Sequence, residues 1–166
     1  MNFSDTRARE IMLHSIAQAR LSNRESVHPF VGACLASADG EIIESAFRAE
    51  TDPKNHCEQE LFKKLGTTID FSDTALFVTL EPCTYRNSNV ASCSNEIINR
   101  GIKKVFIGIV DPNEKINFKG IEYMKENGVF VRMYDDDLAS VLKELNYEFI
   151  NKFLSRKNNC EPAKIL

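Results

Sequence analysis

The stretch from Thr79 to Cys93, TLEPCTYRNSNVASC, decides the fold of this chain. It follows an apolar run that predicts a strand over 75–80, and it leads into a predicted helix over 91–100. Its two cysteines, Cys83 and Cys93, are separated by nine residues, and the first stands directly after a proline. The stretch therefore places two thiols where a buried strand gives way to a helix.

A second group of reactive side chains lies upstream, where His56, Cys57 and Glu58 open a predicted helix over 56–65. Residues two apart on a continuous helix point to different sides. His56 and Glu58 can therefore serve one site only in the first helical turn, and we expect a cap at Asn55 to place them there.

One imidazole and two thiolates are ligands that zinc prefers, and a catalytic zinc site keeps its fourth position for water. The spacing predicts such a site on His56, Cys83 and Cys93, with Glu58 as the carboxylate that moves the protons of that water. The alternatives are a closed structural zinc site with Cys57 as the fourth ligand, and no metal at all. A closed site leaves Glu58 unexplained.

Cys57 stands between the proposed ligand His56 and the proposed acid Glu58, and it has two interpretations. It is either a packing residue whose backbone N–H faces the substrate or the fourth ligand of a closed site. Cys34 lies in a predicted strand and is interpreted as a small buried hydrophobic residue. We assign no role to Cys160 or His14.

The composition is that of one globular domain, with 166 residues of which 27% are charged and 43% hydrophobic. We expect a single domain over 1–154, which carries the predicted zinc site, and a polar C-terminal tail over 155–166. The net charge of −3 argues against a nucleic-acid partner, whose phosphates require a basic face. We find no signal peptide and no apolar run that could span a membrane. The chain has five cysteines, and an odd number without an export signal argues against a disulfide framework. These features predict a cytoplasmic protein with free or metal-bound thiols.

Hydrophobic runs and turn signals predict an α/β fold. Strands over 30–36 and 42–47 flank Asp39-Gly40, which is a strong hairpin signal, and the second of them reads as an edge strand. The nearly continuous apolar runs at 75–80 and 104–110 are separated by helices and are typical of parallel strands. The remaining predicted elements are helices over 5–21, 121–127 and 136–154 and a strand over 129–133. The expected architecture is a three-layer α/β/α sandwich around a five-stranded, mostly parallel sheet with one antiparallel hairpin strand.

Residues 5–153 resemble the cytidine-deaminase-like superfamily, and within it the deaminases of riboflavin biosynthesis. The closer resemblance is carried by 29–33 (PFVGA), 79–83 (TLEPC), 101–113 (GIKKVFIGIVDPN) and 119–121 (KGI). The resemblance implies Zn²⁺ on the His56, Cys83 and Cys93 set and a homo-oligomer, either a dimer or a tetramer. It also implies hydrolytic removal of an exocyclic amine from a small pyrimidine-like heterocycle, with a riboflavin precursor favoured.

The resemblance further suggests that Asp111 and Asn113 line the substrate pocket; the alternative is that Asp111-Pro112-Asn113 is only a turn. His28 replaces the asparagine that usually precedes the proline of the family's first strand, and we count it among the substrate-binding candidates with Cys57. The loop between the cysteines lacks the family's proline-rich sequence and its basic residue. Arg86 either replaces that basic residue or is an exposed arginine without a ligand.

Two other functions remain open. One is deamination of a nucleoside, a nucleotide or a base within a nucleic acid, which the negative charge and the long inter-cysteine loop disfavour. The other is a non-catalytic partner subunit that keeps the deaminase fold. An intact Glu58 argues against that role, because a scaffold has no use for a proton shuttle.

Overall fold

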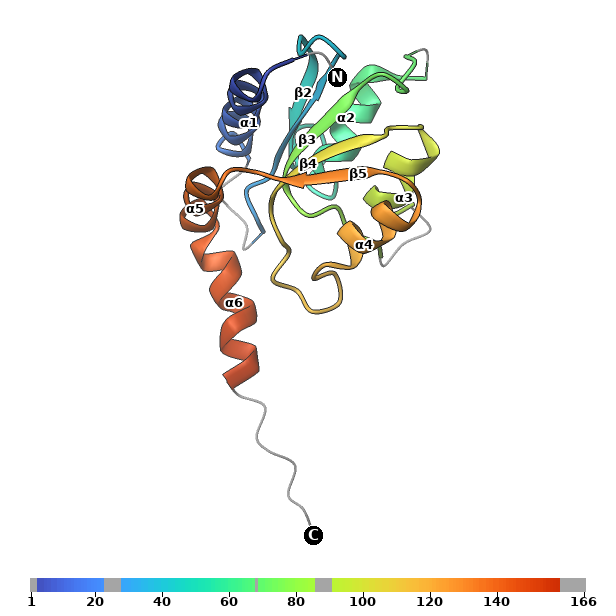
Figure 1. The fold of residues 1–166 in the computed structure, drawn as a ribbon. Coiled ribbons are helices and arrows are strands. Elements are labelled where there is room, and N and C mark those ends of the chain that lie inside the picture. The colour runs from blue at the N-terminus through green and yellow to red at the C-terminus, as the bar shows by residue number, and fades with distance from the viewer. Residues whose placement is uncertain (1–2, 23–27, 68, 86–90, 159–166) are drawn as a thin grey trace.

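The computed structural model describes residues 3–22, 28–67, 69–85 and 91–158 and has a five-stranded sheet at its centre (Figure 1). The strands lie in the spatial order β2-β1-β3-β4-β5. Their bounds are β1 Gly32–Ala36, β2 Ile42–Phe47, β3 Ala75–Leu80, β4 Lys104–Ile109 and β5 Phe130–Met133. The hairpin thus occupies one side of the sheet, with β2 at the edge as the sequence predicts.

Strand β1 runs in the opposite direction to the other four described strands. It pairs antiparallel with β2 and with β3, where Cys34 lies opposite Phe77. The pairs β3–β4 and β4–β5 are parallel, and Phe77 lies opposite Phe106. The rings of these two phenylalanines stack with centroids 4.3 Å apart, so the apolar runs of β3 and β4 pack as a buried pair. The predicted mostly parallel sheet with one antiparallel strand is confirmed.

Helices cover both faces of the sheet (Figure 1). The helices are α1 Asp5–Ala19, α2 Cys57–Leu65, α3 Cys93–Asn99, α4 Lys119–Glu126, α5 Asp136–Leu145 and α6 Tyr147–Asn158. The first and fifth pack on one face, and the second, third and fourth pack on the other. Gly32 permits the close approach of α1, because a Cβ there would lie 2.3 Å from the Ser15 carbonyl oxygen. The three-layer α/β/α architecture is therefore confirmed.

The predicted single helix over 136–154 is wrong, because the chain breaks into α5 and α6 at Asn146. This residue is only 2% exposed. Its Oδ1 accepts a hydrogen bond of 2.7 Å from the Phe30 amide, and its Nδ2 donates to the Phe30 carbonyl at 3.2 Å. The bonds tie the helix junction to the segment that carries His28. Beyond the junction, α6 extends away from the sheet to Asn158, past the expected helix end (Figure 1).

Within the described residues, no helix combines the length and the apolarity needed to cross a membrane. Arg86, Cys160 and all of the predicted tail beyond Asn158 lie outside the described residues.

We predict that Asn146→Ala destabilises the fold, because both backbone groups of Phe30 lose their side-chain partner. The expected loss in the free energy of unfolding is about 1–3 kcal/mol, measured by urea unfolding followed by circular dichroism. Asn99→Ala is the matched control, since Asn99 is an exposed asparagine at the end of α3. Equal unfolding midpoints for the two variants would contradict the role of Asn146.

Candidate active site

His56, Cys83 and Cys93 meet at one point of the fold. Their ligand atoms all lie within 4.8 Å of one another. The His56 Nδ1 atom is 3.3 Å from the Cys93 Sγ and 3.7 Å from the Cys83 Sγ. Residues separated by 27 and 37 positions in the chain thus form one compact cluster, as the spacing predicts.

Three local structures bring these side chains together. His56 is the N-cap residue of α2, and Cys93 is the first residue of α3. The expected cap at Asn55 is therefore wrong by one residue; the Asn55 side chain instead donates to Glu60. Cys83 follows β3, and its carbonyl accepts a hydrogen bond from the Ser94 amide at 3.1 Å. This bond fixes the first turn of α3 against the segment that follows β3.

The cluster fits a zinc ion. Zn–N and Zn–S bonds of about 2.1 and 2.3 Å in a tetrahedral arrangement separate the ligand atoms by roughly 3.5 Å, which matches the observed spacings. The hydrogen bond from Cys93 and, after it, the nearby His56 ring lower the pKa of the Cys83 thiol to about 4, although burial opposes them. The same bond and burial raise the pKa of Cys93. A lowered thiol pKa favours the thiolate, which is the form that binds a metal ion.

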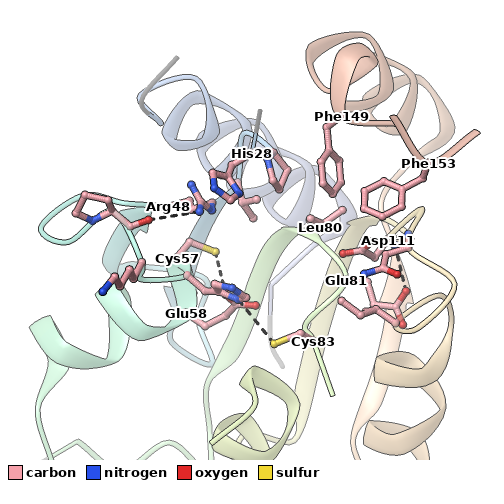
Figure 2. A pocket seen from close by; sticks show the side chains of 17 residues that line it. His28, Arg48, Cys57, Glu58, Leu80, Glu81, Cys83, Asp111, Phe149 and Phe153 are labelled. Carbon is pink, nitrogen blue, oxygen red and sulfur yellow. Dashed lines mark hydrogen bonds between the residues drawn. The ribbon is translucent and has the colours of Figure 1, made fainter. Parts of the chain in front are cut away.

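Glu58 lies in the first turn of α2, beside the cluster (Figure 2). Its side chain is 3% exposed, and burial raises the pKa of its carboxyl group. The Cys57 thiol donates to Glu58 Oε2 at 3.3 Å and is not part of the ligand cluster. Among the described residues, the metal-binding group therefore consists of three ligands with a carboxylic acid next to them, which is not the arrangement of a closed four-ligand site.

A cavity of about 400 Å³ opens in front of these groups (Figure 2). The four substrate-binding candidates His28, Cys57, Asp111 and Asn113 all line it, together with Glu58. Asp111 also forms the predicted turn, since its Oδ1 accepts a hydrogen bond from the Asn113 amide at 2.8 Å. Burial raises the pKa of Asp111 to about 6. The two interpretations of this segment, turn and pocket wall, are thus compatible.

Three residues that the sequence analysis did not select also line the cavity: Arg48, Phe149 and Phe153. The two phenylalanines come from α6 and pack edge to face, with ring centroids 5.2 Å apart. Both follow the break at Asn146, which the predicted single helix over 136–154 did not include. Arg48 follows the edge strand β2, and no motif marked it.

Glu81, inside the motif quoted first, is the buried anchor of a pocket wall. Its carboxylate accepts hydrogen bonds from four backbone N–H groups, two in the segment between β4 and α4 and two in the first turn of α4. Oε2 accepts from Asp111 and Phe118, and Oε1 accepts from Gly120 and Ile121. A carboxylate directly before Pro82 therefore holds the loop that carries Asp111 and Asn113 against the cluster that contains Cys83.

A mixed sheet between two helical layers, with a zinc-type ligand set at the start of two helices, defines the class of zinc-binding deaminase folds. The sequence model of the cytidine and deoxycytidylate deaminase zinc-binding region matches residues 5–109. The chain belongs to this deaminase family, and its His56, Cys83 and Cys93 lie together as a possible zinc site.

Particular relatives are named for riboflavin biosynthesis. The chain is 31% identical over 108 residues to a diaminohydroxyphosphoribosylamino-pyrimidine deaminase of Buchnera aphidicola, covering 65% of this chain and 70% of the relative. It is 34% identical over 111 residues to the riboflavin biosynthesis protein RibD of Actinobacillus pleuropneumoniae, covering 63% of this chain and 26% of that protein.

The crystal structure of a Thermotoga maritima diaminohydroxyphosphoribosylaminopyrimidine deaminase/5-amino-6-(5-phosphoribosylamino)uracil reductase has the same fold. It superimposes with a TM-score of 0.76 at 29% identity, over 92% of this chain and 42% of that chain. A maize relative named riboflavin biosynthesis protein PYRD is 27% identical over 83% of this chain and 33% of its own length. The chain thus spans a third or less of the length of several relatives that it matches.

We predict that the purified protein holds close to one zinc ion per chain and that Cys83→Ala loses most of it, because one thiolate ligand is removed. Metal content is measured by inductively coupled plasma mass spectrometry. Cys34→Ala is the matched control, since Cys34 is a buried thiol in β1 outside the cluster. Equal zinc content in the two variants would contradict the assignment of the site.

We predict that Glu81→Gln lowers the free energy of unfolding by about 1–3 kcal/mol. An amide has one acceptor oxygen, so the N–H groups facing its nitrogen lose their partner. The measurement is a urea unfolding curve, with the exposed Glu126→Gln as control. A Glu81→Gln curve that overlays the control would show that the four hydrogen bonds contribute nothing measurable.

Proposed function

We propose that the chain catalyses the zinc-dependent hydrolytic deamination of an exocyclic amine on a small pyrimidine-like heterocycle. The observation that carries the proposal is the buried carboxyl group of Glu58 beside a three-ligand His/Cys/Cys cluster, with both facing one cavity. A site of this composition combines a position for an activated water with an acid–base group.

His56, Cys83 and Cys93 would hold the zinc ion, which would supply the acidification of a bound water at neutral pH. Glu58 is the catalytic residue: it would accept one proton from the attacking water and give it to a ring nitrogen. It would then take the second proton from the hydroxyl group added to the ring carbon and give it to the departing amine, which leaves as ammonia. Burial favours the protonated form of Glu58, because it raises the pKa of the carboxyl group. The side chain is therefore suited to holding a proton between these two steps.

The other pocket residues bind and orient the ring in this proposal. Asp111 and Asn113 face the cavity from the loop that Glu81 holds, and they offer hydrogen-bonding groups to ring substituents. His28 lines the opposite part of the pocket. The buried Cys57 thiol hydrogen-bonds Glu58 and helps to fix the position of its carboxylate.

A riboflavin-precursor-like pyrimidine is the favoured substrate class. The support comes from relatives, since the Buchnera protein named as a diaminohydroxyphosphoribosylamino-pyrimidine deaminase is matched over 70% of its length. A cavity of about 400 Å³ also suits a small heterocycle with a substituent.

We further propose one catalytic domain over 1–154 in a cytoplasmic homo-oligomer, either a dimer or a tetramer. In the described part of the chain, one sheet and one hydrophobic core cluster support the single domain. The terminal strand β5 exposes Phe130 and Met133, which would be buried by a second subunit. The four described cysteines form no disulfide bond with one another, which suits a reducing compartment. Multi-angle light scattering of the zinc-loaded protein tests the assembly.

The function is tested by ammonia release from aminopyrimidines, including riboflavin precursors, and from free bases, nucleosides and nucleotides. We predict that Glu58→Gln lowers kcat by about 10²–10⁴-fold, because the amide cannot carry the proton, while the zinc content stays near one per chain. Glu122→Gln, at an exposed position on α4, is the control and should keep full activity.

Each alternative function predicts a different result. Turnover of a base in tRNA or single-stranded DNA, with strong salt dependence, would favour a nucleic-acid substrate. A zinc-loaded protein that is inert toward every amine tested, and whose biological activity survives Glu58→Gln, would identify a non-catalytic partner subunit.

A further inference from the structure

Two glutamates of α2 are buried, Glu58 and Glu60. The sequence analysis did not select Glu60, whose side chain is 1% exposed. A buried carboxylate requires hydrogen-bond donors, and Glu60 finds them in the segment that joins β2 to α2. We call residues 49–55 of that segment the β2–α2 loop.

Four hydrogen bonds join the Glu60 carboxylate to the β2–α2 loop. Oε1 accepts from the amides of Thr51 at 2.9 Å and Asp52 at 3.1 Å, and from the side-chain amide of Asn55 at 3.2 Å. Oε2 accepts from the Thr51 hydroxyl at 2.7 Å. Hydrogen bonds to a carboxylate are stronger than those between neutral groups. Glu60 therefore ties both the middle and the end of the loop to α2.

The β2–α2 loop has little apolar packing of its own, because residues 51–54 are exposed. Ala49 has a left-handed backbone with a φ of 61°, which is disfavoured for residues other than glycine and persists only where the surroundings determine it. The Ala49 amide donates to the Asn55 carbonyl at 3.1 Å, and Arg48 Nη2 donates to the Pro53 carbonyl at 3.4 Å (Figure 2). Polar contacts thus fix the loop, and Glu60 supplies four of them.

The loop forms part of the cavity wall, since Pro53 and Lys54 line the cavity. It also leads to His56, but His56 has its own contacts with α2. The His56 amide donates to Gln59 Oε1 at 3.1 Å, and the His56 carbonyl accepts from the Glu60 amide at 3.1 Å. The neighbouring side chains of Gln59 and Glu60 therefore hold different parts of the site, the metal-ligand candidate and the wall.

We infer that Glu60 is a positioning residue for substrate binding, whose carboxylate holds the β2–α2 loop so that Pro53 and Lys54 form the cavity wall. The inference rests on the proposed function, in which this cavity binds the substrate. His56 is capped by Gln59, and Glu58 lies on α2 itself, so loss of the Glu60 carboxylate should affect substrate binding more than the chemical step. Such a change raises KM and leaves kcat nearly unaltered.

The first measurement is amide hydrogen exchange of the zinc-loaded protein. The Thr51 and Asp52 amides donate to Glu60 and should be protected in the wild type. Glu60→Leu removes both acceptor oxygens and should speed the exchange of these two amides at least about tenfold, while the amides of β3 keep their rates. Unchanged exchange at both loop amides would overturn the inference.

The second measurement is ammonia release from the aminopyrimidine that the wild type deaminates best. Glu60→Leu should raise KM about tenfold, with kcat within about twofold of the wild type and zinc content near one per chain. Glu60→Gln is the conservative variant, because its oxygen can replace Oε1 and its amide nitrogen can donate to the Thr51 hydroxyl. It should restore most of the wild-type KM.

Ser15→Ala is the matched control for a loss of stability alone. Ser15 is buried in α1, on the opposite face of the sheet from α2, and hydrogen-bonds the Tyr134 hydroxyl at 2.7 Å. The control should unfold at a lower temperature and keep the wild-type KM.

Thr51→Val probes the same contact from the loop, because it removes the hydroxyl that donates to Glu60 Oε2. If Glu60 acts through the loop, Thr51→Val should raise KM by a smaller factor in the Glu60→Leu background than in the wild type. Equal factors in the two backgrounds would contradict the inference.

The competing role for Glu60 is stability alone. In that case Glu60→Leu lowers the melting temperature, as Ser15→Ala does, and keeps the wild-type KM, so the proposed function stands and the positioning role is refuted. If the wild type releases no amine from any compound while Glu60→Leu speeds the exchange of the loop amides, the proposed function fails and the hold of Glu60 on the loop stands. Should Glu60→Leu not fold, Glu60→Asp, whose carboxylate is one methylene shorter, replaces it in both measurements.

Discussion

The convergence of one imidazole and two thiols within 4.8 Å is the constraint on which the remaining structure depends. Two helices begin at this cluster, and a buried strand ends beside it. Helix starts present unpaired N–H groups and a positive dipole end, both of which favour thiolates. The sheet order places β3 between the hairpin and β4, so groups from distant parts of the chain meet at the same end of β3.

A buried carboxylate needs hydrogen-bond donors, and two glutamates of this site meet the need in different ways. Glu81 takes four backbone N–H groups and in return fixes the pocket loop that follows β4. Glu58 accepts a hydrogen bond from the Cys57 thiol, and burial raises the pKa of its carboxyl group. The first carboxylate is thereby structural, and the second is left able to exchange a proton.

The pocket also has distinct sides. The His56, Cys83 and Cys93 cluster and Glu58 lie at one end, the loop held by Glu81 forms one side, and Arg48 and His28 lie on the other. The α6 helix adds Phe149 and Phe153, which give the cavity an apolar surface suited to a flat ring. Because these contributions come from separate elements, a substitution in one pocket wall can change substrate preference without altering the ligand cluster.

The sequence alone predicted the α/β class, the hairpin, and the grouping of His56, Cys83 and Cys93, because local periodicity and fixed ligand chemistry are written in short stretches. Only the tertiary structure decided what lies around them. The hydrogen bonds between Asn146 and Phe30 join residues 116 positions apart, at the point where the predicted single helix divides into α5 and α6. Arg48 and the donors of Glu81 are likewise brought to the site by chain crossings that leave no local pattern, since burial and long-range contact depend on the whole fold.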